Sequence, residues 1–307
     1  MSDVFTNWTA ESTKKFAREP LVVGHKVHER PMFSDAGLAD LLDRYPRDIM
    51  DIHTMGENRH DAGGFRKGRP GDLPGEELMK AVANGRIWIN LRAANQHMPE
   101  YADLCDELFD EIERVVPGSK IMKRDCGVLI SSPKVKVFYH LDIPLVTLWQ
   151  IRGVKRVYIY PTGEPFARDE QIEDIVLRAT EEEIDYTPAY DDHAFVVDLE
   201  PGMMANWPQN APHRIDNLDS VNVSLSMEFM TVPALIHANA LYANGVLRRK
   251  FGANPSIAGH GAVAKVGKAA LARGMKLFQS DRVFARDIPI TFMVDPSAPN
   301  AVRDIPA

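Results

Sequence analysis

A histidine and an aspartate two positions apart, His140 and Asp142, are the residues of this chain best placed to do chemistry. Side chains alternate between the two faces of a strand, so residues i and i+2 point the same way and can face one metal ion. His213, which opens a later extended run, is the best candidate for a third ligand. Two histidines and one carboxylate form a facial triad with open coordination positions, the arrangement typical of non-haem Fe(II) oxygenases.

The surroundings of these residues carry the argument, because a histidine and an aspartate at this spacing often occur by chance. Residues 134–140, 145–151 and 156–160 are rich in β-branched and aromatic residues, with a turn at Gly153 and a stop at Pro161. Short strands are also expected over 194–198 and 203–207. Residues 220–229 alternate between apolar and polar side chains, which predicts a half-buried strand. A series of such strands favours a barrel or a double-stranded β-helix.

The segments around the first two ligands resemble a known family. His140-Leu-Asp142, Gln150-Ile-Arg-Gly153, Lys155-Arg156 and Pro161 look like the core of the JmjC and cupin-like hydroxylases, among them the asparaginyl hydroxylase of hypoxia-inducible factor. The resemblance covers about residues 125–230, and Pro201-Gly202, Pro208, His213 and Asn217 resemble the second cupin motif. It implies a jelly-roll barrel that uses Fe(II), 2-oxoglutarate and molecular oxygen.

The resemblance also implies that Lys155 pairs with the distal carboxylate of 2-oxoglutarate. Lys155 shares a strand face with Val157 and Ile159, so it is expected to point inward. A lysine buried there is costly unless an anion meets it. The alternative is that Lys155 lies in solvent, beside Arg152 and Arg156.

Two positions depart from the family pattern. Members often carry threonine or serine three residues before the first ligand, where this chain has Val137, and asparagine six residues after it, where this chain has Val146. The second partner of 2-oxoglutarate is therefore open. The candidates are Ser226, Asn222, Tyr139 and Thr147. The polar face of residues 222–226 either lines the pocket or is a solvated sheet face.

The whole chain is expected to be mainly β, with flanking helices. Its 307 residues are 45% hydrophobic and 26% charged, as in an ordinary globular protein. We expect an N-terminal α/β elaboration over 1–120, a jelly-roll core over 121–232 and a C-terminal helical region over 233–307. In the first part the pattern predicts strands over 21–27, 48–53 and 86–90, the last bordering the site. It also predicts helices over 36–44, 76–84 and 99–116, and a long functional loop over 56–75.

The C-terminal region is expected to form helices over 234–250 and 261–278. The first carries an apolar stripe that includes Leu241 and Gly245. The stripe favours a homodimer seam, and the alternative is a helical appendage packed on the barrel. Residues 240–286 contain nine lysines and arginines against one acid, in a chain of net charge −7. Charge runs are usually solvated faces, and the acidic overall balance argues against nucleic acid as a partner.

Compartment and function class follow from weaker signals. The two cysteines, Cys105 and Cys126, form no disulfide framework, and the N-terminus does not read as a signal peptide. No apolar run is long enough to span a bilayer, so a cytoplasmic protein without membrane contact is expected. Three classes remain: a 2-oxoglutarate-dependent oxygenase, a cupin enzyme with another metal, and a non-catalytic binding protein of the same fold. The sequence does not identify the substrate, which could be a protein side chain or a small molecule.

Overall fold

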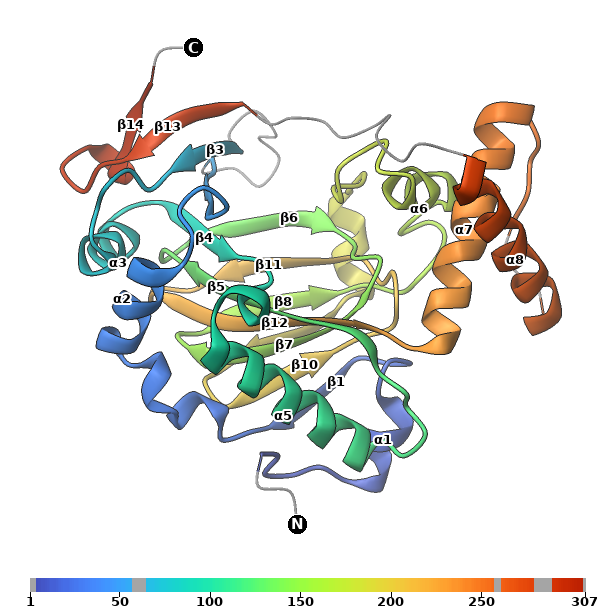
Figure 1. Cartoon of the computed structure of the whole chain (residues 1–307), viewed down its shortest axis with the longest axis horizontal. Coiled ribbons are helices and arrows are strands. Elements are labelled where there is room, and N and C mark those ends of the chain that lie inside the picture. The colour runs from blue at the N-terminus through green and yellow to red at the C-terminus, as the bar shows by residue number, and fades with distance from the viewer. Residues whose placement is uncertain (1–3, 57–64, 257–260, 279–288, 306–307) are drawn as a thin grey trace.

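The computed structural model describes residues 4–56, 65–256, 261–278 and 289–305, and within them two β-sheets face each other (Figure 1). Residues 57–64, the centre of the loop predicted over 56–75, lie outside the described part. Among the described residues, the larger sheet has ten strands. In spatial order they are β1 (Leu21–Gly24), β10 (Met203–Asn206), β7 (Leu145–Arg152), β12 (Asn222–Met230), β5 (Met122–Ser131), β4 (Ile87–Leu91), β2 (Asp51–Thr54), β3 (Arg66–Arg69), β13 (Ile290–Val294) and β14 (Val302–Asp304).

The smaller sheet carries both histidines of the candidate triad. Its four strands within the described part follow the order β6 (Lys136–His140), β11 (His213–Asn217), β8 (Lys155–Ile159) and β9 (Phe195–Leu199). All its pairings are antiparallel, and His213 is the register partner of His140 on one side and Ile159 on the other. The strands expected around the ligands are thus confirmed, with ends shifted by one or two residues.

The turn at Gly153 is confirmed as well. It joins β7 to β8, which lie in different sheets, and Gly153 has a φ of 69°. A Cβ there would come within 2.3 Å of the Val221 carbonyl oxygen, so only glycine fits this left-handed turn. The turn delivers Lys155 to the start of the strand that pairs with β11.

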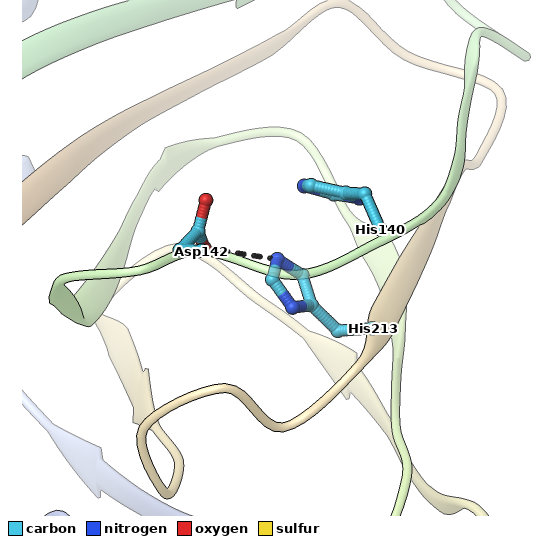
Figure 2. Close-up of side chains that lie close together, drawn as sticks. All are labelled: His140, Asp142 and His213. Carbon is cyan, nitrogen blue, oxygen red and sulfur yellow. Dashed lines mark ion pairs between the residues drawn. The ribbon is translucent and has the colours of Figure 1, made fainter. Parts of the chain in front are cut away.

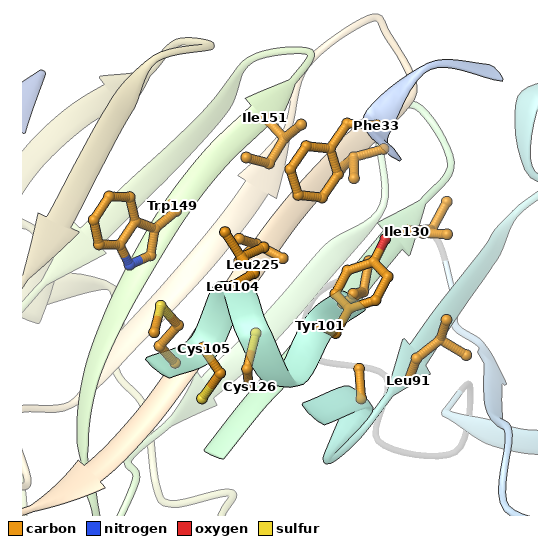
Figure 3. Packing of buried hydrophobic residues seen from close by; sticks show 14 of the residues in the cluster. Phe33, Leu91, Tyr101, Leu104, Cys105, Cys126, Ile130, Trp149, Ile151 and Leu225 are labelled. Atoms are coloured by element: carbon orange, nitrogen blue, oxygen red, sulfur yellow. The ribbon is translucent and has the colours of Figure 1, made fainter. Parts of the chain in front are cut away.

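Alternation along β12 separates the two sides of the larger sheet. Val223, Leu225 and Met227 enter the main apolar cluster, whereas Ser226 and Glu228 line a cavity between the sheets. On the cluster side, helix α5 (Pro99–Val115) lies across the strands, and Leu104 and Cys105 pack against Cys126 of β5 (Figure 3). Both cysteines are buried and unpaired with each other. The strand predicted over 220–229 is therefore present, but it is not half-buried, because Asn222 and Ser224 on its polar face are buried as well.

The remaining helices cover the edges of the two sheets. They are α1 (Ala10–Lys15), α2 (Asp35–Arg44), α3 (Gly75–Asn84), α4 (Ala94–His97), α6 (Asp169–Val176), α7 (Val232–Phe251) and α8 (Ala262–Phe278). Ser34 caps α2, as the sequence predicts, by accepting a hydrogen bond from the Gly37 amide. The helices predicted over 76–84, 99–116, 234–250 and 261–278 correspond to α3, α5, α7 and α8.

The apolar stripe of α7 is buried within the chain. Leu241 is 1% exposed in a cluster with Ile172 and Ile175 of α6, and Tyr242 and Val246 pack with Ala272 of α8. The helical appendage packed on the barrel is the alternative that these contacts support. The stripe is therefore not available as the seam of a homodimer, because this chain already covers it.

Candidate metal centre

The three candidate ligands meet at one end of the space between the sheets. His140 ends β6, Asp142 follows two residues later and His213 begins β11. Each offers a ligand atom, and these atoms lie within 4.8 Å of one another. Figure 2 shows the carboxylate and the two imidazoles facing a common point, with His213 Nε2 3.3 Å from Asp142 Oδ2. Sequence spacing and strand pairing together account for this cluster.

Backbone carbonyls orient both imidazoles. His140 Nδ1 lies 2.8 Å from the Phe138 carbonyl oxygen, and His213 Nδ1 lies 3.1 Å from that of Ala211. Since a carbonyl only accepts hydrogen bonds, each Nδ1 carries the hydrogen and each Nε2 lone pair faces the cluster. This is the usual outer support of a metal-binding histidine.

Burial makes these residues costly without a cation. Burial and the nearby His140 hold the pKa of His213 well below its ordinary value, and burial raises the pKa of the Asp142 carboxyl. A divalent cation would compensate for both, because it stabilises the carboxylate and needs neutral imidazole. The residues present therefore fit a divalent metal with nitrogen and oxygen ligands.

A cavity of about 210 Å³ extends from the triad between the two sheets, and we call it the chamber. Trp88 and Asn90 of β4 line it, which confirms that the strand expected over 86–90 borders the site. Along β11, His213, Ile215 and Asn217 all face into it. The first and last of these positions are four residue steps apart, about 13 Å at 3.3 Å per step, so the chamber has a triad end and a far end.

Lys155 lies at the far end, where it is the register partner of Asn217. Its side chain points inward, as predicted, and the residue is 3% exposed. Among the residues that the structure describes, no carboxylate forms an ion pair with it. Burial lowers the pKa of Lys155 to about 7. An incoming anion would stabilise the charged ammonium at this position.

The chamber brings together only one of the four further residues predicted to bind the cosubstrate. Ser226 lines it, whereas Tyr139, Thr147 and Asn222 do not. The Tyr139 hydroxyl donates to the Phe166 carbonyl on the outer side of the smaller sheet. These placements do not fit the cosubstrate contacts expected of the three residues, because their polar groups serve other partners.

Two of those partners lie within the larger sheet. Thr147 Oγ1 accepts a hydrogen bond from Trp149 Nε1, on the cluster side of β7. Asn222 Oδ1 accepts from Gln150 Nε2, and Ser224 Oγ donates to Gln150 Oε1. The polar face of residues 222–226 is thus neither solvated nor wholly pocket lining: two of its residues hold Gln150, and the third lines the chamber.

Several chamber residues escaped the sequence analysis. Glu228 and Asp125 face each other across β12 and β5, and both line the chamber. Burial, followed by the nearby charge of Asp142, raises the pKa of Glu228 to about 8. Glu228 could have been found from the sequence, because it is two positions after Ser226 and therefore on the same face of the strand. Asp125 lay in a strand that was not predicted, and Trp207, whose ring centroid lies 4.6 Å from that of His213, had no such signal.

A second, larger cavity of about 1240 Å³ adjoins the chamber. The two share Arg92, Val137 and Glu182 in their linings. The larger one runs along the segment that follows α6 and along the start of α7, where Leu235 and Ala238 line it. The chamber therefore opens toward a space that is several times its own size.

The arrangement of the two sheets is similar to that of solved structures. No protein-family model and no curated protein sequence matches the chain. The structure is similar to that of Escherichia coli YcfD, with a TM-score of 0.51 over 92% of this chain and 71% of YcfD, at 18% identity. A second structure of that protein, described as a ribosomal oxygenase in complex with cobalt and 2-oxoglutarate, gives a TM-score of 0.50 over 91% and 69%, at 17% identity. The likeness establishes the fold, which is the jelly-roll that the resemblance led us to expect.

Within the ranges that the structure describes, no helix is both long enough and apolar enough to cross a bilayer.

Proposed function

We propose that the chain is an Fe(II)- and 2-oxoglutarate-dependent oxygenase, with hydroxylation of an unidentified substrate as its reaction. The observation that carries the proposal is the pairing, in one chamber, of a two-histidine, one-carboxylate cluster with a buried lysine that lacks an anionic partner among the described residues. The fold supports it, because the similar protein YcfD has been solved with cobalt and 2-oxoglutarate.

The residues of the chain would divide the work between the two ends of the chamber. His140, Asp142 and His213 would hold the iron, and Lys155 would bind the distal carboxylate of 2-oxoglutarate. Iron bound there would supply oxygen activation, coupled to conversion of 2-oxoglutarate to succinate and carbon dioxide. The apolar walls formed by Val146, Leu148 and Ile215 would limit the access of water.

The alternative is a cupin enzyme with another metal, or a binding protein of the same fold. Such a site needs the metal ligands but has no need of a buried lysine at the far end of the chamber. A lysine whose burial lowers its pKa to about 7 is costly to retain without a function, and this favours the oxygenase.

For the substrate, the assembly and the compartment we propose only a general class. The substrate is a protein side chain or a small molecule, and the larger cavity beside the chamber has room for either. A homodimer stays a prediction, with an interface other than the buried stripe of α7. Buried cysteines without a disulfide fit a cytoplasmic location. Nucleic acid and membrane are not among the partners we propose.

The direct test is turnover of 2-oxoglutarate without any substrate. Purified protein with Fe(II), 2-oxoglutarate and air should form succinate slowly, and Asp142→Ala should abolish it. His97→Ala, which changes an exposed histidine outside the cluster, is the matched control and should keep the wild-type rate. Succinate formation equal in wild type and Asp142→Ala would refute the proposal.

A further inference from the structure

The far end of the chamber contains a hydrogen bond that joins the two sheets. Asn217 Nδ2 of β11 donates to Ser131 Oγ of β5 at 2.7 Å and to the Ser132 carbonyl oxygen at 3.0 Å. Ser131 and Asn217 are 5% and 6% exposed, and both line the chamber with Lys155. A buried amide, a hydroxyl and an ammonium group therefore meet at the end of the chamber opposite the triad.

The direction of these hydrogen bonds follows from the carbonyl. The Ser132 oxygen can only accept, so the amino side of the Asn217 amide must face it and Ser131 Oγ. Ser131 Oγ thus accepts one amide hydrogen. Its own hydroxyl hydrogen has no acceptor among the residues that the structure describes. Within the described part of the chain, Ser131 and Lys155 are two buried donors at the far end without acceptors, which is the environment that a carboxylate requires.

We propose that Ser131, oriented by Asn217, is the second hydrogen-bond donor to the distal carboxylate of 2-oxoglutarate, beside Lys155. This inference rests on the proposed function. Ser131 would supply the hydroxyl that family members often have at the position of Val137, whose apolar side chain lines the chamber. Asn217 acts as a positioning residue, because both of its amide hydrogens are engaged by Ser131 and Ser132.

Ser226 is the competing donor, and register separates the two. In the pairing of β12 with β5, Ser226 is opposite Gly127, whereas Ser131 is opposite Asn222. Ser226 therefore lies four residues nearer than Ser131 to the pair formed by Asp125 and Glu228. Glu228 lies close enough to Asp142 for the two carboxylates to interact, so this end of β12 is beside the triad. Ser226 is therefore on the triad side of the chamber, and Ser131 is at the level of Lys155.

The experiment compares two ligands that differ only in the distal carboxylate. 2-Oxoglutarate and 2-oxopentanoate are titrated calorimetrically into protein loaded with Co²⁺ under nitrogen, so that binding is read without turnover. Wild type should prefer 2-oxoglutarate. Ser131→Ala should weaken 2-oxoglutarate by roughly 10- to 100-fold, the range for losing a hydrogen bond to a charged group, and leave 2-oxopentanoate unchanged. Ser131→Thr, which keeps the hydroxyl, should restore the preference.

Controls separate the role of Ser131 from general damage. Ser224→Ala removes another buried hydroxyl, which is bonded to Gln150 and lies outside the chamber lining, and should change neither affinity. If Ser131→Ala does not fold, Ser131→Cys replaces it, because a thiol has a similar size and is only a weak donor. Ser131→Cys should reduce the preference for 2-oxoglutarate over 2-oxopentanoate.

The possible failures are distinguishable. Wild-type protein that binds Co²⁺ but neither ligand would overturn the proposed function itself. A preference for 2-oxoglutarate that survives in Ser131→Ala and Ser131→Cys but is lost in Ser226→Ala would overturn the assignment of Ser131 and leave the proposed function intact. Equal weakening of both ligands in the Ser131 variants would show that Ser131 supports the fold rather than the carboxylate.

Discussion

At the scale of single residues, one device holds both histidines of the triad. Each imidazole is fixed by the carbonyl of the residue two positions earlier, Phe138 for His140 and Ala211 for His213. The residue types and the strand period predicted the three ligands. They could not predict which nitrogen faces the metal, because that depends on the local path of the backbone after β6 and before β11.

Removing one ligand should remove the metal. His213→Ala should weaken metal binding by more than about 100-fold, since loss of outer-shell support alone costs about 10- to 100-fold. Metal content after dialysis against a weak chelator, read by atomic emission, checks this. His97→Ala should bind as wild type does, and a His213→Ala protein with full metal content would show that the third ligand is another residue.

Lys155 should control the cosubstrate and not the metal. Truncating one partner of a buried charge pair costs about 2–5 kcal/mol, so Lys155→Ala should weaken 2-oxoglutarate by roughly 30- to several-thousand-fold. Metal affinity should stay the same, because Lys155 is not a ligand. Lys155→Arg should rescue only in part, since its planar fork differs in shape and donor geometry from an ammonium. Undiminished 2-oxoglutarate binding by Lys155→Ala would contradict the account.

The pKa of Lys155 gives that binding a pH dependence. With a pKa of about 7 in the empty chamber, the lysine is charged below pH 7 and ready to bind a dianion. Above pH 7 it must first take up a proton, so affinity should fall by up to about tenfold per pH unit. Calorimetry at pH 6.5, 7.5 and 8.5 measures the slope. Because other groups titrate in both proteins, the difference between wild type and Lys155→Arg isolates Lys155, and identical slopes would rule it out.

At the scale of elements, alternation and caps identified the strands around the ligands and most helices. Strand β5 was missed because it begins Met122-Lys-Arg-Asp, a polar start that does not look like a central strand. β13 and β14 were missed because they join the sheet beside β3, more than 200 residues earlier in the chain. Such pairings are tertiary contacts, which local patterns do not encode.

Leu241 separates the two interpretations of α7. As part of a dimer seam, Leu241→Arg would dissociate the protein; as a core residue that is 1% exposed, it should instead destabilise the fold by more than about 3 kcal/mol. Urea unfolding together with size-exclusion chromatography distinguishes these outcomes. Val232→Arg, at an exposed position of the same helix, should be nearly neutral. Dissociation of a Leu241→Arg dimer with an unchanged free energy of unfolding would show that the stripe of α7 is a dimer interface after all.

His25, directly after β1, is hydrogen-bonded to Met203 at the start of β10 and should make the fold acid-sensitive. Its Nε2–H donates to the Met203 carbonyl and its Nδ1 accepts from the Val27 amide, so the neutral form is required. Burial lowers the pKa of His25 from 6.5 to about 4. The unfolded chain therefore binds a proton that the folded chain refuses, and about 3 kcal/mol of stability should be lost as the pH falls from 6.5 to 4.

Replacing the titrating group tests this. His25→Gln should show a smaller loss of unfolding free energy between pH 7 and pH 4.5 than wild type, measured by urea denaturation at both pH values. The carboxyl groups titrate alike in the two proteins, so their contributions cancel in the difference. An equal loss in both would remove His25 from the acid response.

At the scale of the whole molecule, two sheets enclose a chamber with the three candidate metal ligands at one end and the buried Lys155 at the other. The core of this architecture could be expected from residues 125–230, where ligands, turn and lysine follow one another at informative spacings. The far-end contact between Ser131 and Asn217 could not, because it joins strands 86 residues apart in the chain. The burial of the α7 stripe by α6 and α8 is a fact of the same kind.

In the proposed function, the metal and the distal carboxylate of 2-oxoglutarate occupy opposite ends of this chamber. Anomalous X-ray scattering at the cobalt edge, from a crystal grown with Co²⁺ and 2-oxoglutarate, tests it most directly. We expect one strong peak within coordination distance of His140 Nε2, His213 Nε2 and the Asp142 carboxylate, with density for 2-oxoglutarate running from it to Lys155. A peak bound by other residues, or 2-oxoglutarate whose distal carboxylate lies away from Lys155, would contradict it.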